Sequence, residues 1–170
     1  MHYSNIDKKA TKRNVIDLLE SQRSLKIELA HLKLSTGISA IQYDGMPKGQ
    51  GHVNGVEANL LHDIVKVQKR RDELTFRLAY ISNTLLTMHD IDEFNDYLAT
   101  LLEYRYLKRW TVMKCCMQLV SDTDYGREKY TGMVSESQFF DQRDQAVLAF
   151  VEIYPERSKL IVEKTGDFPE

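Results

Sequence analysis

The sequence predicts an all-α protein in which a long N-terminal helical hairpin or coiled coil precedes a C-terminal helix-turn-helix domain. Of the three prolines, Pro47 alone lies before residue 155, so little interrupts long helices. Apolar residues recur at spacings of three and four, and no run of alternating β-branched residues indicates a strand. We expect two domains, a dimerisation trunk at residues 1–89 and a helix-turn-helix domain at residues 90–170.

Length, charge and hydropathy limit the class of protein. The 170 residues suffice for one core of ordinary size, or for a small domain with an elongated appendage. The formal net charge is -2, so affinity for nucleic acid has to come from a local basic patch. No apolar run approaches the ~18–20 residues that cross a bilayer, and the N-terminal segment lacks the apolar core of a signal peptide. These features predict a cytoplasmic protein with no membrane partner.

The residues that commonly carry catalysis or bind metals are few and scattered. Cys115 and Cys116 are adjacent on a predicted helix and cannot form an unstrained disulfide, so we expect one buried and one half-buried thiol. The segment MPKGQG has neither the phosphate-loop spacing nor a preceding strand. The five histidines fall in no metal-ligand or catalytic-triad spacing: His2, His31, His52, His62 and His89. We therefore predict no enzyme, no catalytic residue, no metal and no cofactor.

The first helix of the trunk is predicted from about Lys12 to Leu34, with Gly37 as its stop. Its apolar stripe, with one glutamine in it, consists of Val15, Leu18, Gln22, Leu25, Leu29 and Leu32. Four glycines and a proline between Ser39 and Gly55 predict a loop at residues 35–55, the clearest boundary in the chain.

The second trunk helix is predicted from Asn54 or Val56 to Met88. Steps of four and three residues connect Leu60, Ile64, Val67, Arg71, Leu74, Leu78, Ile81, Leu85 and Met88. Such a helix extends roughly 45–50 Å, more than a compact domain of this size needs. It pairs with the first helix as an antiparallel hairpin, with a second copy as a dimer, or with both in a four-helix assembly. A homodimer or a higher homo-oligomer is therefore expected.

A third helix with Asp90 or Asp92 as its cap leads into a basic and aromatic segment. The cations are Arg105, Lys108, Arg109 and Lys114, beside Tyr104, Tyr106 and Trp110. Cations and aromatic rings together at a helix end suit contact with DNA phosphates. The alternative is that the aromatic residues belong to the core and the cations are solvated.

Two further helices complete the predicted helix-turn-helix. Thr111 caps a helix from Val112 to Val120, and the polar run from Ser121 to Met133 separates it from the last helix. Ser135 and Gln138 form a capping box at the start of that helix, whose buried stripe is predicted as Phe139, Gln142, Ala146, Val147 and Phe150. The remaining polar side chains could read base edges, although Glu136, Asp141 and Asp144 repel phosphate. The DNA-binding candidates of this helix are Ser135, Ser137, Gln138, Asp141, Gln142, Arg143 and Gln145.

Several of these segments resemble the ArpU and RinA-like family of phage transcriptional regulators. The resemblance rests on RYLKRW at Arg105–Trp110 and SESQFFDQRDQAVLAF at Ser135–Phe150, with a weaker match in the following VEIYPERSKLIV and in the glycine-rich loop around Gly45–Pro47. It implies a C-terminal helix-turn-helix like that of sigma-factor region 4. It also implies binding to double-stranded DNA, activation of late packaging or lysis genes in the bacterial host cytoplasm, and contact with host RNA polymerase.

Two other functions remain open from the residues. A DNA-packaging adaptor of the small-terminase type also joins a helix-turn-helix to an oligomerising coiled coil, and it forms rings. A protein-interaction module that binds RNA polymerase or another protein would not contact DNA through its acidic last helix. Oligomeric state distinguishes the first of these from a regulator, and the salt dependence of DNA binding distinguishes the second.

Overall fold

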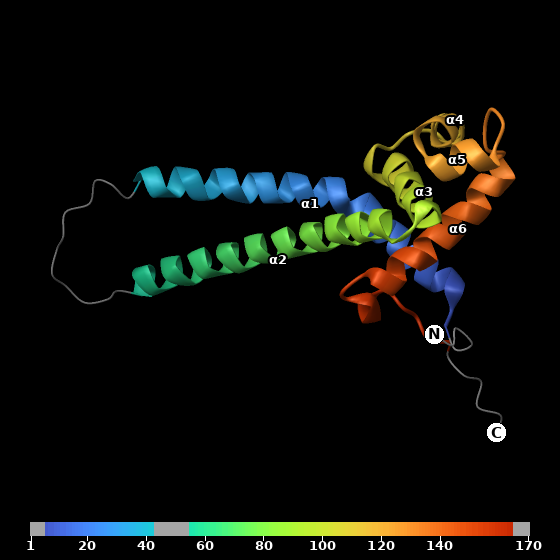
Figure 1. The fold of residues 1–170 in the computed structure, drawn as a ribbon. Helices are drawn as coiled ribbons and strands as arrows, with labels where there is room; N and C mark the ends of the chain where they lie inside the picture. Colours follow the sequence, from blue (N-terminus) through green and yellow to red (C-terminus); the bar gives the residue numbers. More distant parts are fainter. Residues whose placement is uncertain (1–5, 43–54, 165–170) are drawn as a thin grey trace, which may run out of the picture. The chain divides into compact units, whose positions relative to one another are not determined.

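The computed structural model describes residues 6–42 and 55–164, and it confirms the predicted all-α class. The chain order of the elements is shown in Figure 1. The α-helices are α1 (Lys8–Gln42), α2 (Gly55–Ile91), α3 (Glu93–Leu102), α4 (Val112–Asp122), α5 (Asp124–Lys129) and α6 (Glu136–Ile153). A π-helix, η2 (Glu103–Leu107), continues α3, and a short 3-10 helix, η3 (Arg157–Lys159), follows α6.

The chain forms two compact units that do not coincide with the predicted boundary at residue 89. Unit 1 consists of Met1–Gln22 and Tyr80–Glu170, and unit 2 consists of Arg23–Ala79. Helices α1 and α2 each contribute residues to both units. The first turns of α1 and the last turns of α2 therefore belong to the same unit as the predicted helix-turn-helix.

Unit 1 has a continuous apolar core. Helix α3 packs against α6 and also contacts α4 and α5. The largest side chains that are fully buried there include Tyr97 of α3 and Phe139 and Phe150 of α6. The predicted stripe of α6 is confirmed, because Gln142, Ala146 and Val147 are buried as well.

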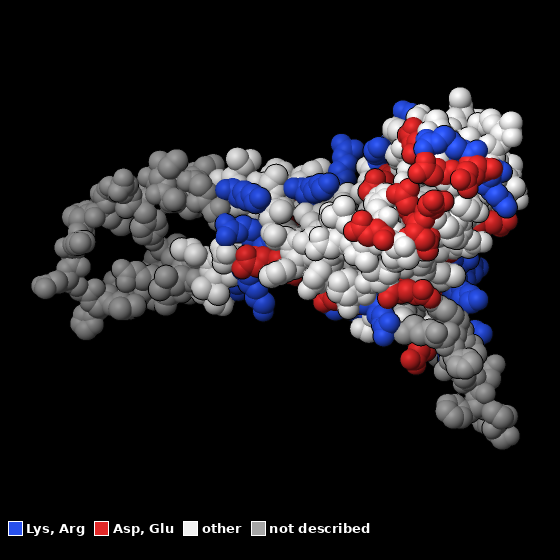
Figure 2. All heavy atoms as spheres, in the orientation of Figure 1, with Lys and Arg blue, Asp and Glu red and all other residues white. Residues whose placement is uncertain are grey.

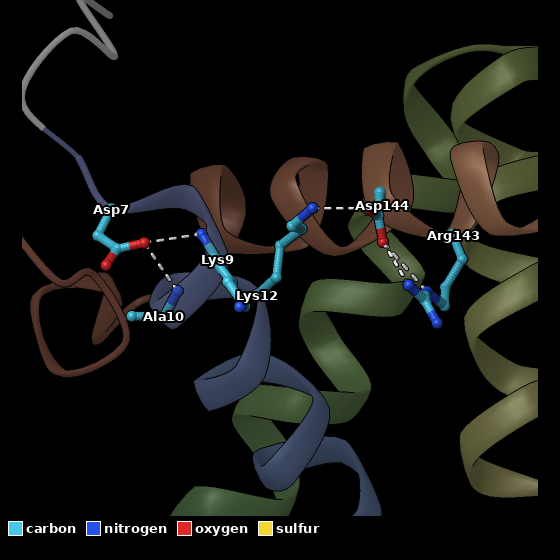
Figure 3. Close-up of polar contacts among 6 residues, drawn as sticks. All are labelled: Asp7, Lys9, Ala10, Lys12, Arg143 and Asp144. Carbon is cyan, nitrogen blue, oxygen red and sulfur yellow. Dashed lines mark hydrogen bonds and ion pairs between the residues drawn. The ribbon is translucent and has the colours of Figure 1, made fainter.

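The ends of the described chain are tied to each other in unit 1. The Asp7 amide donates to the Val162 carbonyl at 2.8 Å, and the Val162 amide donates to Thr11 Oγ1 at 3.1 Å. The Asp7 carboxylate accepts from the amides of Lys9 and Ala10, so it caps the start of α1 (Figure 3). These contacts fix the first turn of α1 against the segment that follows α6.

The predicted caps form, and they determine where the helices of unit 1 begin. The Asp92 side chain accepts from the Asn95 amide at the start of α3, and Thr111 accepts from the Lys114 amide at the start of α4. Ser135 and Gln138 make the predicted capping box of α6. Between η2 and α4 the chain turns at Arg109, whose φ of 56° is left-handed.

In unit 2 the α1 and α2 segments run antiparallel beside each other (Figure 1). The Arg70 guanidinium binds the Glu28 carboxylate through two hydrogen bonds, of 2.7 and 3.1 Å. Leu25 and Leu74 are buried in this unit, whereas Ile64, predicted to lie in the same stripe, is exposed. The stripe of α2 thus faces α1 of the same chain near Leu74.

Several details of the predicted boundaries are wrong. Helix α1 continues through Gly37 to Gln42, because one glycine in a helix costs only about 1 kcal/mol. The polar run at residues 121–133 contains the helix α5, which Thr123 caps. Of the predicted loop at residues 35–55, residues 43–54 lie outside the described residues, and these include Gly45–Pro47. The side chain of Leu60 lies outside the description as well.

Candidate nucleic-acid interface

Trp110 lies at the centre of the predicted basic and aromatic cluster. The Lys114 ammonium lies 3.9 Å and the Lys108 ammonium 4.9 Å from the centroid of the Trp110 ring. Lys108 is also 4.3 Å from the centroid of Tyr104, whose ring packs on Trp110 at 4.4 Å between centroids. A cation held over an aromatic face keeps its charge and hydrogen-bond donors near a defined position.

The two arginines of the cluster are held by backbone carbonyls. Arg105 Nη1 donates to the Trp110 carbonyl at 3.1 Å, and Arg109 Nη2 donates to the Glu20 carbonyl at 3.2 Å. Both line an open surface pocket together with Glu20 and Tyr106. Trp110 therefore contacts three of the four predicted phosphate-binding cations, namely Arg105, Lys108 and Lys114.

The aromatic side chains of this segment belong to the core of unit 1, as the alternative interpretation predicted. Tyr104 and Tyr106 are buried and Trp110 is partly buried. Burial raises the pKa of Tyr104, and its hydroxyl donates to Asp122 Oδ2 at 2.5 Å. Hydrogen bonds from Tyr104 and Gln118 lower the pKa of the Asp122 carboxyl, which stays ionised near Lys108. The ring platform under the two lysines is thus anchored to the end of α4.

The cluster lies at the N-terminus of α4. Lys108, Arg109 and Trp110 directly precede the Thr111 cap, and Lys114 lies in the first turn. The unpaired amides and the dipole of a helix N-terminus favour anions, and the neighbouring cations add full positive charge. The arrangement suits a phosphate group.

The predicted base-reading residues of α6 differ in accessibility. Ser137, Asp141 and Gln145 are exposed. Ser135 and Gln138 are also exposed, but their side chains are engaged with each other, with Ser135 Oγ 2.9 Å from Gln138 Oε1.

Gln142 cannot read a base in this fold, so that assignment is wrong. It is buried and accepts from the Tyr97 hydroxyl at 2.5 Å, while its amide donates to the Tyr130 hydroxyl. Its side chain is engaged inside the unit, between the hydroxyls of the buried Tyr97 and the half-buried Tyr130.

Arg143 is not a free cation either. Its Nη2 lies 2.7 Å from Asp144 Oδ1, and Lys12 Nζ of α1 lies 2.5 Å from Asp144 Oδ2 (Figure 3). Partial burial raises the pKa of Asp144, but the hydrogen bonds from Lys12 and Arg143 outweigh it, and the net pKa lies below the usual range. Asp144 therefore joins α6 to the first turns of α1, a role that its position in the sequence did not indicate.

An exposed apolar group on the same unit was not predicted from the sequence. Its members are Met113 and Met117 of α4, Met133 before α6 and Phe140 of α6. The Val134 amide donates to the Cys116 carbonyl at 3.1 Å, which brings the segment before α6 against α4. The Arg143 guanidinium lies 5.0 Å from the centroid of the Phe140 ring.

The two thiols of the chain lie inside unit 1. Cys115 and Cys116 are both buried, against the expectation that one is half-buried, and burial raises the pKa of each thiol. Among the described residues, no three His, Cys, Asp or Glu side chains lie close enough to hold a metal ion. None of the described helices is long and apolar enough to span a bilayer.

Charges of both signs are mixed over α4 and α5 on the face that Figure 2 shows. The basic cluster is thus a local feature, as the net charge of -2 requires.

Comparison of the chain with protein-family models, curated proteins and solved structures gave no match. What the molecule binds has to be inferred from its own surface.

Proposed function

We propose that the protein binds double-stranded DNA through unit 1 and regulates transcription. The observation that carries the proposal is the placement of Lys108 and Lys114 on the Trp110 ring at the N-terminus of α4. Lysine ammonium groups beside a helix N-terminus suit a phosphate group, and phosphate contacts position a protein on a duplex.

In this proposal the first turns of α6 enter the major groove. Gln145 pairs with adenine, Asp141 accepts from the cytosine amino group, and the Phe140 ring contacts a thymine methyl group. Ser137 adds a hydroxyl that both donates and accepts. Arg143 supports α6 through Asp144 and is not among the base contacts.

The resemblance to the ArpU and RinA-like regulators suggests which process this binding serves. We propose activation of phage late genes, with RNA polymerase of the bacterial host as a second partner. A second candidate is a protein-interaction module, favoured by the exposed Met113, Met117, Met133 and Phe140 and by the acidic Glu136 and Asp141 of α6. Flexible methionine side chains are common at protein-binding surfaces.

Salt dependence of duplex binding separates the two candidates. Anisotropy of a labelled duplex is measured with the full chain over a series of KCl concentrations. Each phosphate contact contributes about 0.9 to the slope of log K against log salt, so Lys108→Ala and Lys114→Ala should each flatten it by about one. Lys159→Ala, an exposed lysine outside the cluster, is the matched control. A slope near zero, or equal effects of all three variants, contradicts DNA binding through the cluster.

Selection of bound fragments from phage genomic DNA, followed by footprinting, tests the biological role. A protected site upstream of a late operon supports the regulator, and its half-site spacing gives the dimer geometry. Enrichment at a packaging-initiation site replaces the regulator with the packaging adaptor. If no fragment is enriched, the protein-interaction candidate replaces both.

A further inference from the structure

Helix α2 carries a second stripe within unit 2, on the side opposite the one that faces α1. Successive residues of an α-helix are 100° apart, which places Val65, Lys69, Asp72 and Phe76 together and roughly 170° from the buried Leu74 side. Val65 is 63% and Phe76 61% exposed, although both are large and apolar. With Ile64, Gln68 and Glu73, these four residues line a shallow groove on the helix surface.

We propose that this stripe is the surface on which a second copy of the chain docks, with the two α2 helices antiparallel. The stripe residues are separated by four, three and four positions, so their spacing is the same read from either end. In an antiparallel pair related by a two-fold axis, residue i of one copy meets residue j of the other and j meets i, so a stripe with this spacing meets itself position by position. The axis passes between Lys69 and Asp72.

Charge complementarity selects this occupant and this orientation. In the antiparallel register Lys69 of each copy meets Asp72 of the other, and Val65 of each meets Phe76 of the other. At the outer positions an apolar side chain therefore contacts an apolar side chain, and at the two inner positions opposite charges face each other. A parallel pair in register would place Lys69 against Lys69 and Asp72 against Asp72. Like charges would then repel at both inner positions.

The proposed dimer differs from the dimer expected through the heptad stripe. That stripe includes Leu74, which is fully buried within the chain and cannot also face a second copy. A four-residue stripe on one helix covers less area than an obligate interface, so the dimer is weak and depends on protein concentration. It does not rest on DNA binding, and its test needs no DNA.

Sedimentation equilibrium of the full chain, from about 10 µM to about 1 mM, measures the mass. The mass should rise with concentration from the 19.8 kDa monomer towards twice that value. Lys69→Glu and Asp72→Lys each convert two attractive contacts of the symmetric dimer into repulsive ones, so each should raise the dissociation constant about tenfold. The double variant Lys69→Glu/Asp72→Lys exchanges the charges and should restore it to within about threefold.

The double variant distinguishes this interface from a general effect of surface charge, since only the antiparallel register restores attraction. Phe76→Ser should weaken the dimer, whereas Leu86→Ser, a residue of α2 that is 60% exposed and lies outside the groove, should not. Helicity by circular dichroism confirms that each variant folds. The proposal is overturned by a monomeric mass throughout, by a dimer that Lys69→Glu leaves unchanged, or by failure of the double variant to restore association.

Discussion

At the scale of single residues, Gln142 links three parts of unit 1. Its side chain joins Tyr97 of α3, Tyr130 between α5 and α6, and α6 itself. A leucine would fill the space but leave the buried Tyr97 hydroxyl without this partner, and burying an unpaired hydroxyl costs more than the hydrogen bond contributes. The glutamine therefore helps to fix how α6 packs against α3.

We expect Gln142→Ala to lower the free energy of unfolding by about 1–3 kcal/mol, because the buried Tyr97 hydroxyl loses its partner in the core. Urea denaturation followed by circular dichroism measures the change. Gln145→Ala is the matched control, because Gln145 is exposed on the same helix and its truncation should cost less than about 0.5 kcal/mol. Equal losses from the two variants would show that Gln142 contributes no more than a surface glutamine.

Asp144 is a further residue whose role depends on the fold. Its partners Lys12 and Arg143 approach from α1 and from α6, and Lys12 is 132 positions away in sequence. Because no local sequence pattern indicates a pair this far apart, the sequence predicted that Arg143 contacts DNA. In the fold, the Arg143 guanidinium is instead paired with the Asp144 carboxylate.

At the scale of elements, what could be predicted from the sequence depended on local signals. Thr111 and Ser135 were each predicted to cap a helix, and Asp92 was one of two candidates, with Asp90, for the cap of α3, because a capping side chain acts within three residues of itself. The six-residue α5 has no detectable periodicity, and it sits where a Cβ on Gly126 would overlap the Leu119 carbonyl oxygen of α4. That close approach is a tertiary contact, so the sequence alone showed only a polar run.

The junction of α2 and α3 contains a titratable group that couples three elements. His89 Nδ1 of α2 lies 2.6 Å from Asp96 Oδ1 of α3, and Nε2 lies 3.4 Å from Glu103 Oε1 of η2. Burial lowers the pKa of His89, but hydrogen bonds and charge from Asp96 and Glu103 outweigh it, and the net pKa is raised above 6.5. The charged ring thus fastens the end of α2 to the helices that follow.

This raised pKa gives the stability of unit 1 a defined pH dependence. A pKa that is higher in the folded state contributes stability fully below the unfolded value, and the contribution is lost as pH rises through the folded value. The free energy of unfolding of the wild type should therefore exceed that of His89→Gln by more at pH 5.5 than at pH 8.5 or so. Urea titrations of both proteins across this range measure the difference. A difference that is independent of pH would mean that the histidine charge does not stabilise the junction.

At the scale of the whole molecule, the two units differ in how much apolar surface they bury. Unit 1 holds a core that includes Tyr97, Phe139 and Phe150, whereas in the described part of unit 2 the buried apolar residues are Leu25 and Leu74. The proposed functions divide in the same way, with DNA contacts on unit 1 and self-association on unit 2.

The difference in burial predicts that unit 2 opens more readily than unit 1. Few buried apolar contacts and many solvent-exposed backbone hydrogen bonds mark regions of low local stability. Amides of residues 62–79 should exchange with deuterium faster than those of α3 and α6 at low protein concentration. Leu74→Ala, which removes a fully buried side chain, should cost about 2–5 kcal/mol, and the cost should appear as faster exchange in unit 2 while residues 93–153 keep their protection. Exchange that accelerates equally in both units would show that they unfold as one cooperative body, and mass spectrometry of peptides from each unit distinguishes the two outcomes.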